Sequence, residues 1–232
     1  MRVIGLQPLY LPWAGMFDMM DQCDLLIFSD DVQFVKGSWQ CRNRIKTPDG
    51  VKWVSVSVDR TVPSTTLIKD IRVKHEVEWI KRNLSQIKEA YRKAPYFQPL
   101  FKDLTEILER KDTHLETISV TLIKYLAAQL GIYTPCMRAS ELGIQARGAE
   151  RKVRVCKAVG ATECLDGASG RELYDTDFFF QHGIRLFFHE YEHPVYSQLY
   201  GEFVSHLSVI DLLFNEGPNA RDILRSGRTS SY

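Results

Sequence analysis

Short apolar runs alternate with amphipathic stretches along this chain, and this alternation restricts the possible folds more than any other feature. Runs typical of buried strands occupy residues 3–6, 24–28, 134–139, 163–165 and 184–189, and residues 53–58 alternate apolar and polar side chains as a half-buried strand does. Strands that alternate with helices favour an α/β fold with a mostly parallel sheet and helices on both faces.

Helical spacing of apolar residues fills the segments between these strands. The pattern predicts helices at about 13–22, 149–159, 171–182 and 207–214, and a longer helical stretch at about 76–130. With 232 residues, 44% of them hydrophobic, the chain can bury one sizeable core. We expect a single domain over residues 1–232, with a helical lobe at about 76–130 inserted over one edge of the sheet.

Charge and hydropathy limit the binding partners and the cellular compartment that we expect for this chain. The formal net charge of +1 gives no global electrostatic reason to expect DNA or an anionic membrane as a partner. No apolar run reaches the roughly 18 residues of a spanning helix, and the apolar start at residues 1–6 is too short for a signal peptide. We therefore expect a cytoplasmic protein.

The five cysteines are odd in number and widely spaced, and no CxxC motif occurs. A disulfide framework or a structural zinc site is therefore not expected, and buried reduced thiols are. Cys41 stands apart because Arg42 and Arg44 follow it, and nearby positive charge would favour its thiolate.

Ligands of parallel α/β sheets bind beyond the carboxyl ends of the strands, so the loops after the apolar runs are the candidate sites. In the first, residues 7–17, the side chains of Gln7, Tyr10 and Trp13 could bind a planar or sugar ring, and Gly15 allows a close backbone approach. A packed turn is the alternative interpretation.

The second loop carries Asp30 and Asp31 directly after a strand. Paired carboxylates can bind an ammonium group, act as a general base or hold Mg²⁺. A solvated turn would also use aspartate.

The third segment, residues 38–44, places Asn43 between Arg42 and Arg44, close to Trp39. Arginine offers a planar fork for phosphate, and tryptophan a stacking face. This set fits a nucleotide diphosphate better than it fits a solvated run of charge.

The fourth loop, residues 166–171, is rich in small residues and contains Ser169. Small residues that open a helix expose N–H groups able to bind an anion, but the loop is neither a P-loop nor a GxGxxG motif. A simple helix cap is the alternative.

Residues 189–193 match HExxH, the zinc-protease motif. That motif requires a helix, whereas a strand precedes it here and Pro194 disfavours a helical His193. We expect no metal site, and interpret both histidines as residues that end a strand and line a polar pocket.

The C-terminal region supplies the remaining candidates. Tyr196 and Gln198 are candidate substrate-binding residues. Ser205 could cap the last helix and place His206 at its start, where imidazole stays neutral and can accept a proton, with Asp211 as the group that orients it. Structural hydrogen bonding by His206 and Asp211 is the alternative.

These same stretches resemble the WbqC-like family of bacterial surface-polysaccharide gene clusters. The resemblance lies in QPLYLPWAGMFDMMDQCDLLIFSDDVQF, SWQCRNRIKTPDG, LGIYTP, GATECLDGASGRELY and HPVYSQLYGEFVSHLSVIDLLFNEGP, which together extend from residue 7 to residue 218. It implies work on O-antigen or related polysaccharides, described for the family as glycine or aminoacyl transfer to an amino sugar.

The order of strand, proline-containing turn, helix with an internal glycine and second strand also resembles the nucleotidylyltransferase-like fold of pantothenate synthetase. That likeness implies a Rossmann-like sheet. Enzymes of that group carry an HxGH-type motif for ATP, and here residues 11–15 contain no histidine.

Three hypotheses follow. The first is an acyl or aminoacyl (glycine) transferase that modifies a nucleotide-linked amino sugar. It takes its acyl group from a carrier-protein thioester or an aminoacyl-tRNA and needs no ATP, and the sequence identifies no cofactor for it. In it, the carboxylates of the second loop bind the amine, the Trp39 group holds the diphosphate, and His206 accepts the proton. The second is an amide-forming ligase that uses ATP and Mg²⁺, and the third is a non-catalytic binder of sugar nucleotides.

Overall fold

The computed structural model describes residues 1–76 and 78–229, so residue 77 of the predicted lobe and residues 230–232 lie outside it. The strands are β1 (Arg2–Leu6), β2 (Leu25–Phe28), β3 (Arg42–Thr47), β4 (Gly50–Ser55), β5 (Cys136–Arg138), β6 (Glu163–Asp166) and β7 (Arg185–Phe188). The α-helices are α1 (Ala14–Asp21), α2 (Trp79–Tyr91), α3 (Phe97–Glu109), α4 (Leu115–Gln129), α5 (Gly148–Ala158), α6 (Thr176–Gln181), α7 (Val209–Glu216) and α8 (Ala220–Ser226).

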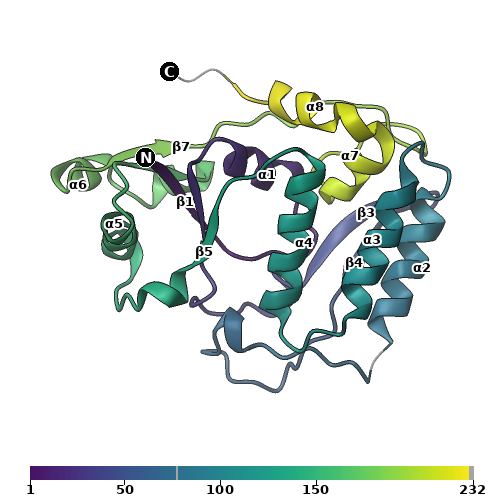
Figure 1. Ribbon diagram of the computed structural model, residues 1–232, viewed down its shortest axis with the longest axis horizontal. Coiled ribbons are helices and arrows are strands. Elements are labelled where there is room, and N and C mark those ends of the chain that lie inside the picture. The colour runs from purple at the N-terminus through teal and green to yellow at the C-terminus, as the bar shows by residue number, and fades with distance from the viewer. Residues whose placement is uncertain (77, 230–232) are drawn as a thin grey trace.

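Five of the strands form one parallel sheet in the order β5-β2-β1-β6-β7. Helices α5 and α6 lie on one side of this sheet, and α1, α4, α7 and α8 lie on the other (Figure 1). The chain runs outward from β1 in one direction through β2 and β5, and then continues on the other side of β1 with β6. The α/β fold with a parallel, Rossmann-like sheet is therefore confirmed.

Strands β3 and β4 form a separate antiparallel hairpin, whereas the sequence analysis interpreted residues 38–44 as a loop and residues 53–58 as a strand within the α/β alternation. The turn at Pro48 and Asp49 joins the two strands, and Gly50 adopts a φ of +103°, which a side chain would disfavour. Asn43 and Ile45 face the protein interior, while Arg42 and Arg44 share the opposite face of β3.

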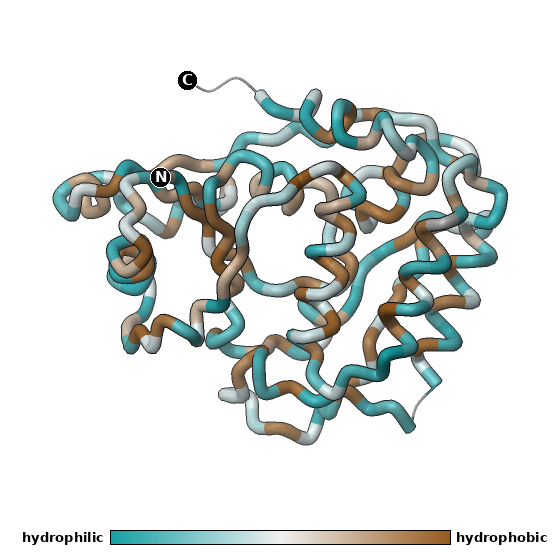
Figure 2. Tube along the Cα trace, viewed as in Figure 1, coloured by the Kyte–Doolittle hydropathy of each residue, from teal (hydrophilic) through white to brown (hydrophobic). Residues whose placement is uncertain are grey.

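The sheet separates two groups of buried side chains. The larger group joins α1, the hairpin and helices α2 to α4 with α7 and α8, and the smaller one lies between the other face of the sheet and α5 and α6. Hydrophobic segments accordingly follow the strands and the inward sides of the helices (Figure 2). The hairpin and helices α2 and α3 thus share the main core with α1.

Helix boundaries near the candidate residues differ from the sequence analysis, and α8 was not predicted. The last predicted helix begins at Val209 rather than near residue 207, because Ser208 caps it and accepts a hydrogen bond from the Ile210 N–H. The predicted helix at 171–182 is shortened to α6, with a 3₁₀ helix, Ala168–Glu172, before it. His206 consequently lies in the connecting segment before the helix and outside its first turn.

In the part of the chain that the structure describes, every helix is too short or too polar to cross a bilayer.

Candidate ligand site at the carboxyl edge of the sheet

The predicted loops come together where the parallel strands end. Strand β1 has β2 on one side and β6 on the other, and the connections leave β1 and β6 toward opposite faces of the sheet (Figure 1). Ligands of open α/β sheets bind in the crevice that such a reversal of strand order creates. The candidate site lies at this point.

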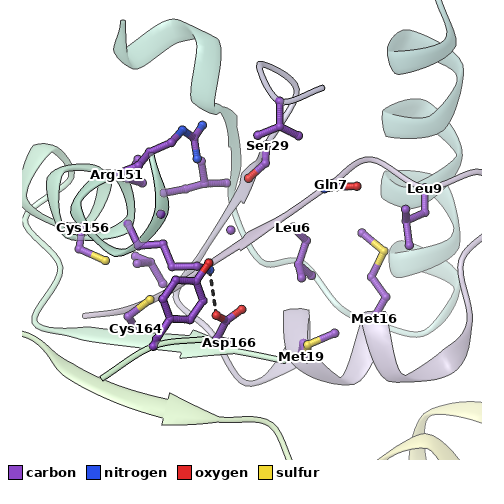
Figure 3. Close-up of a pocket in the computed structure, with 18 of the residues that line it drawn as sticks. Leu6, Gln7, Leu9, Met16, Met19, Ser29, Arg151, Cys156, Cys164 and Asp166 are labelled. Carbon is purple, nitrogen blue, oxygen red and sulfur yellow. Dashed lines mark ion pairs between the residues drawn. The ribbon is translucent and has the colours of Figure 1, made fainter. Parts of the chain in front are cut away.

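A cavity of about 450 Å³ occupies this position. Its walls come from β1, β2 and β6, from one side of α5 and from α1: Val3, Gly5, Leu6, Gln7, Leu9, Trp13, Met16, Met19, Ile27, Ser29, Val32, Gly148, Arg151, Lys152, Val155, Cys156, Cys164, Asp166 and Tyr174. Figure 3 shows Arg151 on the α5 side, Asp166 at the end of β6, and Met16 and Met19 on α1. The volume suits a ligand of nucleotide size.

The charged groups of this large cavity occur as ion pairs. Arg151 pairs with Asp31, and the Lys152 ammonium lies 3.0 Å from the Asp166 carboxylate, as the dashed line in Figure 3 shows. The side chains of these four residues are between 14% and 19% exposed. Lys152 also lies 5.0 Å from the ring centre of Tyr174. The cavity therefore presents both signs of charge, with each cation held beside a carboxylate.

Two buried thiols, Cys156 and Cys164, line the same cavity. The hydrogen bond from Cys164 lowers the pKa of Cys156, and that same bond, together with burial, raises the pKa of Cys164. All five cysteines are free thiols. The expectation for Cys41 was wrong, because burial raises the pKa of this thiol more strongly than Arg42 lowers it.

A second, smaller cavity of about 220 Å³ adjoins the first, since Leu9 and Trp13 line both. Its other walls are Trp39, Asn43 and His206. The rings of Trp13 and His206 are nearly parallel, with centres 5.4 Å apart and an angle of 24° between their planes. The small cavity is thus an aromatic slot beside the hairpin.

Backbone hydrogen bonds fix the segment that carries His206. The Ser208 N–H donates to the Arg44 carbonyl, and the Val209 N–H donates to the Pro12 carbonyl. His206 itself has a φ of +58°, a conformation that costs free energy for a residue with a side chain. The structure holds this imidazole against Trp13 at the mouth of the small cavity, where it is exposed.

The predicted link between His206 and Asp211 is absent. Nδ1 of His206 lies 2.8 Å from the Ser205 hydroxyl. Asp211 is 1% exposed, and its carboxylate accepts hydrogen bonds from the hydroxyls of Tyr91 and Tyr196 at 2.8 Å and 2.9 Å. Burial raises the pKa of Asp211. Asp211 is therefore a structural acceptor in the first turn of α7, in agreement with the alternative interpretation.

Asp30 is also structural. It is 1% exposed, and both of its carboxylate oxygens accept hydrogen bonds from Ser140, one from the backbone N–H at 2.9 Å and one from the hydroxyl at 2.5 Å. This arrangement ties the end of β2 to the segment after β5. Asp31 instead pairs with Arg151, which lines the large cavity while Asp31 lies behind it, so the two adjacent carboxylates do not act as a pair.

Several other predicted substrate-binding residues already form hydrogen bonds within the protein. Tyr10 is 0% exposed, and its hydroxyl accepts a hydrogen bond from Asn83. The Asn43 amide donates to the Leu11 carbonyl at 2.7 Å and so fixes the turn after β1, although Asn43 also contributes to the small cavity. Tyr196 is buried against Asp211, and Gln198 exchanges hydrogen bonds with the backbone of Val204.

The other predicted residues lie on accessible surfaces. Gln7 and Trp13 line the large cavity, whereas Ser169 is exposed in the 3₁₀ helix after β6 and lines neither cavity. Trp39 lines the small cavity, and Arg42 and Arg44 lie on the hairpin face beside it. The predicted diphosphate group is therefore separate from the large cavity.

His189 directly follows β7 and belongs to a buried network of hydrogen bonds. Its Nε2 lies 2.8 Å from the carboxylate of Asp18, which is 0% exposed, and Arg228 contacts the other oxygen of Asp18 at 2.7 Å. His193 lies apart from this pair, with its Nδ1 near the Pro194 carbonyl. Among the described residues, no group of three or more histidine, cysteine, aspartate or glutamate side chains is arranged to hold a metal ion.

Sequence reasoning missed the α5 side of the large cavity. Arg151 and Lys152 were interpreted only as residues of an amphipathic helix. Two adjacent basic residues in the first turns of a helix that leads from one strand to the next were the available signal. Ser29 and Asp166 did fall inside predicted loops, but no role was given to either.

The sheet and its edge define the class: an α/β protein with a Rossmann-like sheet and a polar cavity at the point where the strand order reverses. Comparison with known proteins gives the family, since residues 7–223 match the WbqC-like protein family and the chain belongs to it. It is also 32% identical over 226 residues to the uncharacterized protein Rv1507c of Mycobacterium tuberculosis, which covers 97% of each chain. No solved structure matches the chain.

Proposed function

We propose that this protein is a transferase that adds an acyl or aminoacyl group, such as glycine, to the amine of a nucleotide-linked sugar in surface-polysaccharide synthesis. Membership in the WbqC-like family supports the pathway. The observation that carries the proposal is the paired charge of the large cavity, in which Arg151 lies beside Asp31 and Lys152 beside Asp166. A nucleotide-linked amino sugar carries both a diphosphate and an ammonium group, so it can satisfy both signs of charge.

In this proposal, residues of the large cavity bind the diphosphate and the amine of the ligand. Arg151 and Lys152 bind the diphosphate, since both line the cavity and are only partly exposed. Asp31 and Asp166 accept hydrogen bonds from the sugar amine before it reacts. This assignment moves the diphosphate from the hairpin arginines of the sequence-based hypothesis to α5.

His206 remains the proposed proton acceptor for the attacking amine. It lines the small cavity, on the other side of Leu9 and Trp13 from Arg151, so the sugar amine would have to reach across these two side chains. Ser205, which contacts Nδ1, replaces Asp211 as the partner of the imidazole. One proton of the ammonium group passes to a cavity carboxylate, so that the neutral amine can attack the acyl carbonyl and form the C–N bond. The C–S bond of the carrier thioester or the C–O bond of the aminoacyl-tRNA then breaks, and the imidazole carries the second amine proton to the leaving thiolate or hydroxyl oxygen.

A thermal-shift screen tests the binding half of this proposal. A ligand that binds only the folded state raises the melting temperature by mass action. We expect a nucleotide-linked amino sugar to stabilise the protein more than the same sugar nucleotide without the amine. Arg151→Gln should abolish the shift, whereas Arg154→Gln, on the same helix but exposed and paired with Glu150, should retain it. Equal shifts for the two sugar nucleotides would contradict the proposal.

The reaction itself distinguishes the proposal from the ATP-dependent ligase. We expect mass spectrometry to detect an acylated sugar nucleotide when the protein is supplied with a carrier-protein thioester or an aminoacyl-tRNA and no ATP. Product that forms only with ATP, Mg²⁺ and a free acid would identify the ligase. Tight binding without product from any donor would indicate a binding protein.

A further inference from the structure

The outer face of the β3–β4 hairpin carries Trp53, Arg42 and Arg44, and Trp39 from the preceding segment packs against it; the large cavity uses none of these four residues. Trp39 and Trp53 are 43% and 40% exposed, and their ring centres lie 5.1 Å apart. The Arg42 guanidinium lies 4.2 Å from the ring centre of Trp53, and that of Arg44 lies 5.5 Å from Trp39. Such stacking presents flat, partly solvated surfaces of positive charge.

These arginines differ from the cations of the large cavity. Within residues 1–76 and 78–229, neither Arg42 nor Arg44 forms an ion pair with a carboxylate, and the Nε–H donors of both have no hydrogen-bond acceptor. The Arg44 guanidinium donates a hydrogen bond of 3.1 Å to the His206 carbonyl. The hairpin face therefore offers uncompensated positive charge to an anion.

The small cavity beside this face has the shape and chemistry for one planar ring. Trp13, Trp39 and His206 surround it, and about 220 Å³ is too little for a whole nucleotide with its phosphate. Asn43 has little capacity left for sugar hydroxyls, because its amide already bonds to the Tyr10 and Leu11 carbonyls and to the Arg44 N–H. A planar aromatic ring fits this lining better than a neutral sugar does.

We propose that the small cavity and the hairpin face form a second site, which binds a nucleobase between Trp13 and Trp39 and its phosphate on Arg42 and Arg44. The ring enters the slot and the phosphate stays outside it, over the arginines. A free mononucleotide and the terminal nucleotide of a single-stranded RNA share this chemistry. The site adds to the proposed function but does not depend on the ligand of the large cavity.

Tryptophan fluorescence gives a direct assay. Trp13, Trp39 and Trp53 lie at the site, whereas Trp79 is 0% exposed in the core. We expect adenosine monophosphate, added under excitation at 295 nm, to quench the emission, and ribose 5-phosphate to bind much more weakly. Trp39→Ala should weaken binding about five- to 100-fold, while Trp39→Phe should retain most of the affinity.

One further variant tests the contact between the phosphate and the arginines, and another controls for the loss of an exposed aromatic side chain. Arg44→Gln should weaken binding and reduce its dependence on salt. Tyr133→Ala removes an aromatic side chain that is 79% exposed elsewhere and should change nothing. A six-nucleotide single-stranded RNA that binds at least ten times more tightly than the mononucleotide identifies RNA as the source, and equal affinities identify the mononucleotide.

Three results would overturn the second site: no quenching by either nucleotide, equal binding of ribose 5-phosphate and adenosine monophosphate, or unchanged affinity in a folded Trp39→Ala variant. The sugar-nucleotide thermal shift separates this failure from failure of the proposed function. Trp39→Ala should retain that shift, and Arg151→Gln should retain nucleotide quenching.

Discussion

Arg228 connects the C-terminal segment to a carboxylate that has no exposure to solvent. Its Nε contacts the Asp18 carboxylate at 2.7 Å, and another guanidinium nitrogen contacts Asp21. Asp18 also receives a 2.6 Å hydrogen bond from Gln22 and lies next to His189. We expect Arg228→Met to destabilise the protein because it leaves the charge of Asp18 buried with weaker compensation.

The contacts of Arg228 and Asp18 determine how much free energy of unfolding the Arg228→Met variant loses. Removal of one partner of a buried ion pair costs about 3–5 kcal/mol. The Arg228 side chain is 32% exposed, while Asp18 is fully buried and keeps Gln22 and His189, so we expect a loss at or below the lower end, about 2–3 kcal/mol. Asp18→Asn combined with Arg228→Met removes both charges and should recover at least 1 kcal/mol of that loss.

Urea unfolding at pH 7, followed by far-UV circular dichroism, measures both values. The midpoint of Arg228→Met should fall by roughly 1 M, with an unchanged slope. Arg185→Met is the matched control, since Arg185 pairs with Glu163 at the surface with 67% of its side chain exposed and should cost less than about 1 kcal/mol. Equal losses for Arg228→Met and Arg185→Met, or simple additivity in the double variant, would refute the reasoning.

Three further predictions concern other parts of the structure. Gly15→Ala would place its Cβ 2.0 Å from the Trp13 ring, so the ring must move; we expect altered tryptophan emission and weaker binding in both cavities, measured by fluorescence and thermal shift. Burial raises the pKa of Asp211, so the folded state binds this proton more tightly than the unfolded state, and wild-type stability should fall as the pH rises above about 4 through that raised pKa. Asp211→Asn should lose this part of the pH dependence in urea unfolding at pH 4 and pH 7, and an unchanged profile would contradict it. Gly217→Ala, with a φ of +50° and a Cβ 2.4 Å from an aromatic ring, should cost more than about 2 kcal/mol in the same assay, whereas Gly143→Ala, with a φ of +62° and open space around it, should cost about 1 kcal/mol.

The strands of the parallel sheet could be predicted because their apolar runs are short, buried and followed by polar loops. Val3 and Ile4 in β1 and Leu26 and Ile27 in β2 are almost fully buried, as such runs require. The hairpin could not be predicted in the same way, since its buried face includes Asn43, which is 1% exposed. A polar residue at an inward position hides the period of two on which strand prediction depends.

The candidate site was only partly predictable for a related reason. Chemistry alone cannot tell whether a carboxylate is free to bind a ligand or already satisfied inside the protein. Asp30 bonds to Ser140, which lies 110 residues away in the sequence, and Asp211 bonds to Tyr91, which lies 120 residues away. Asp31 has the same side chain as Asp30 and follows it directly, yet it faces Arg151 at the cavity. Only long-range contacts separate these roles.

The paired charges of the large cavity also imply how it would select a ligand. An anionic group that takes Arg151 away from Asp31 leaves that carboxylate without its partner in a largely buried position. A ligand that also carries an amine supplies a new partner to Asp31, so the exchange keeps every charge paired. An unsatisfied buried polar group costs about 1–3 kcal/mol, which corresponds to a difference in affinity of roughly five- to 150-fold. Both ligands offer the same diphosphate to Arg151 and Lys152, but only the amino sugar nucleotide gives Asp31 a new partner. The ion pairs therefore favour the amino sugar nucleotide, because its hydroxyl analogue leaves the Asp31 carboxylate unpaired.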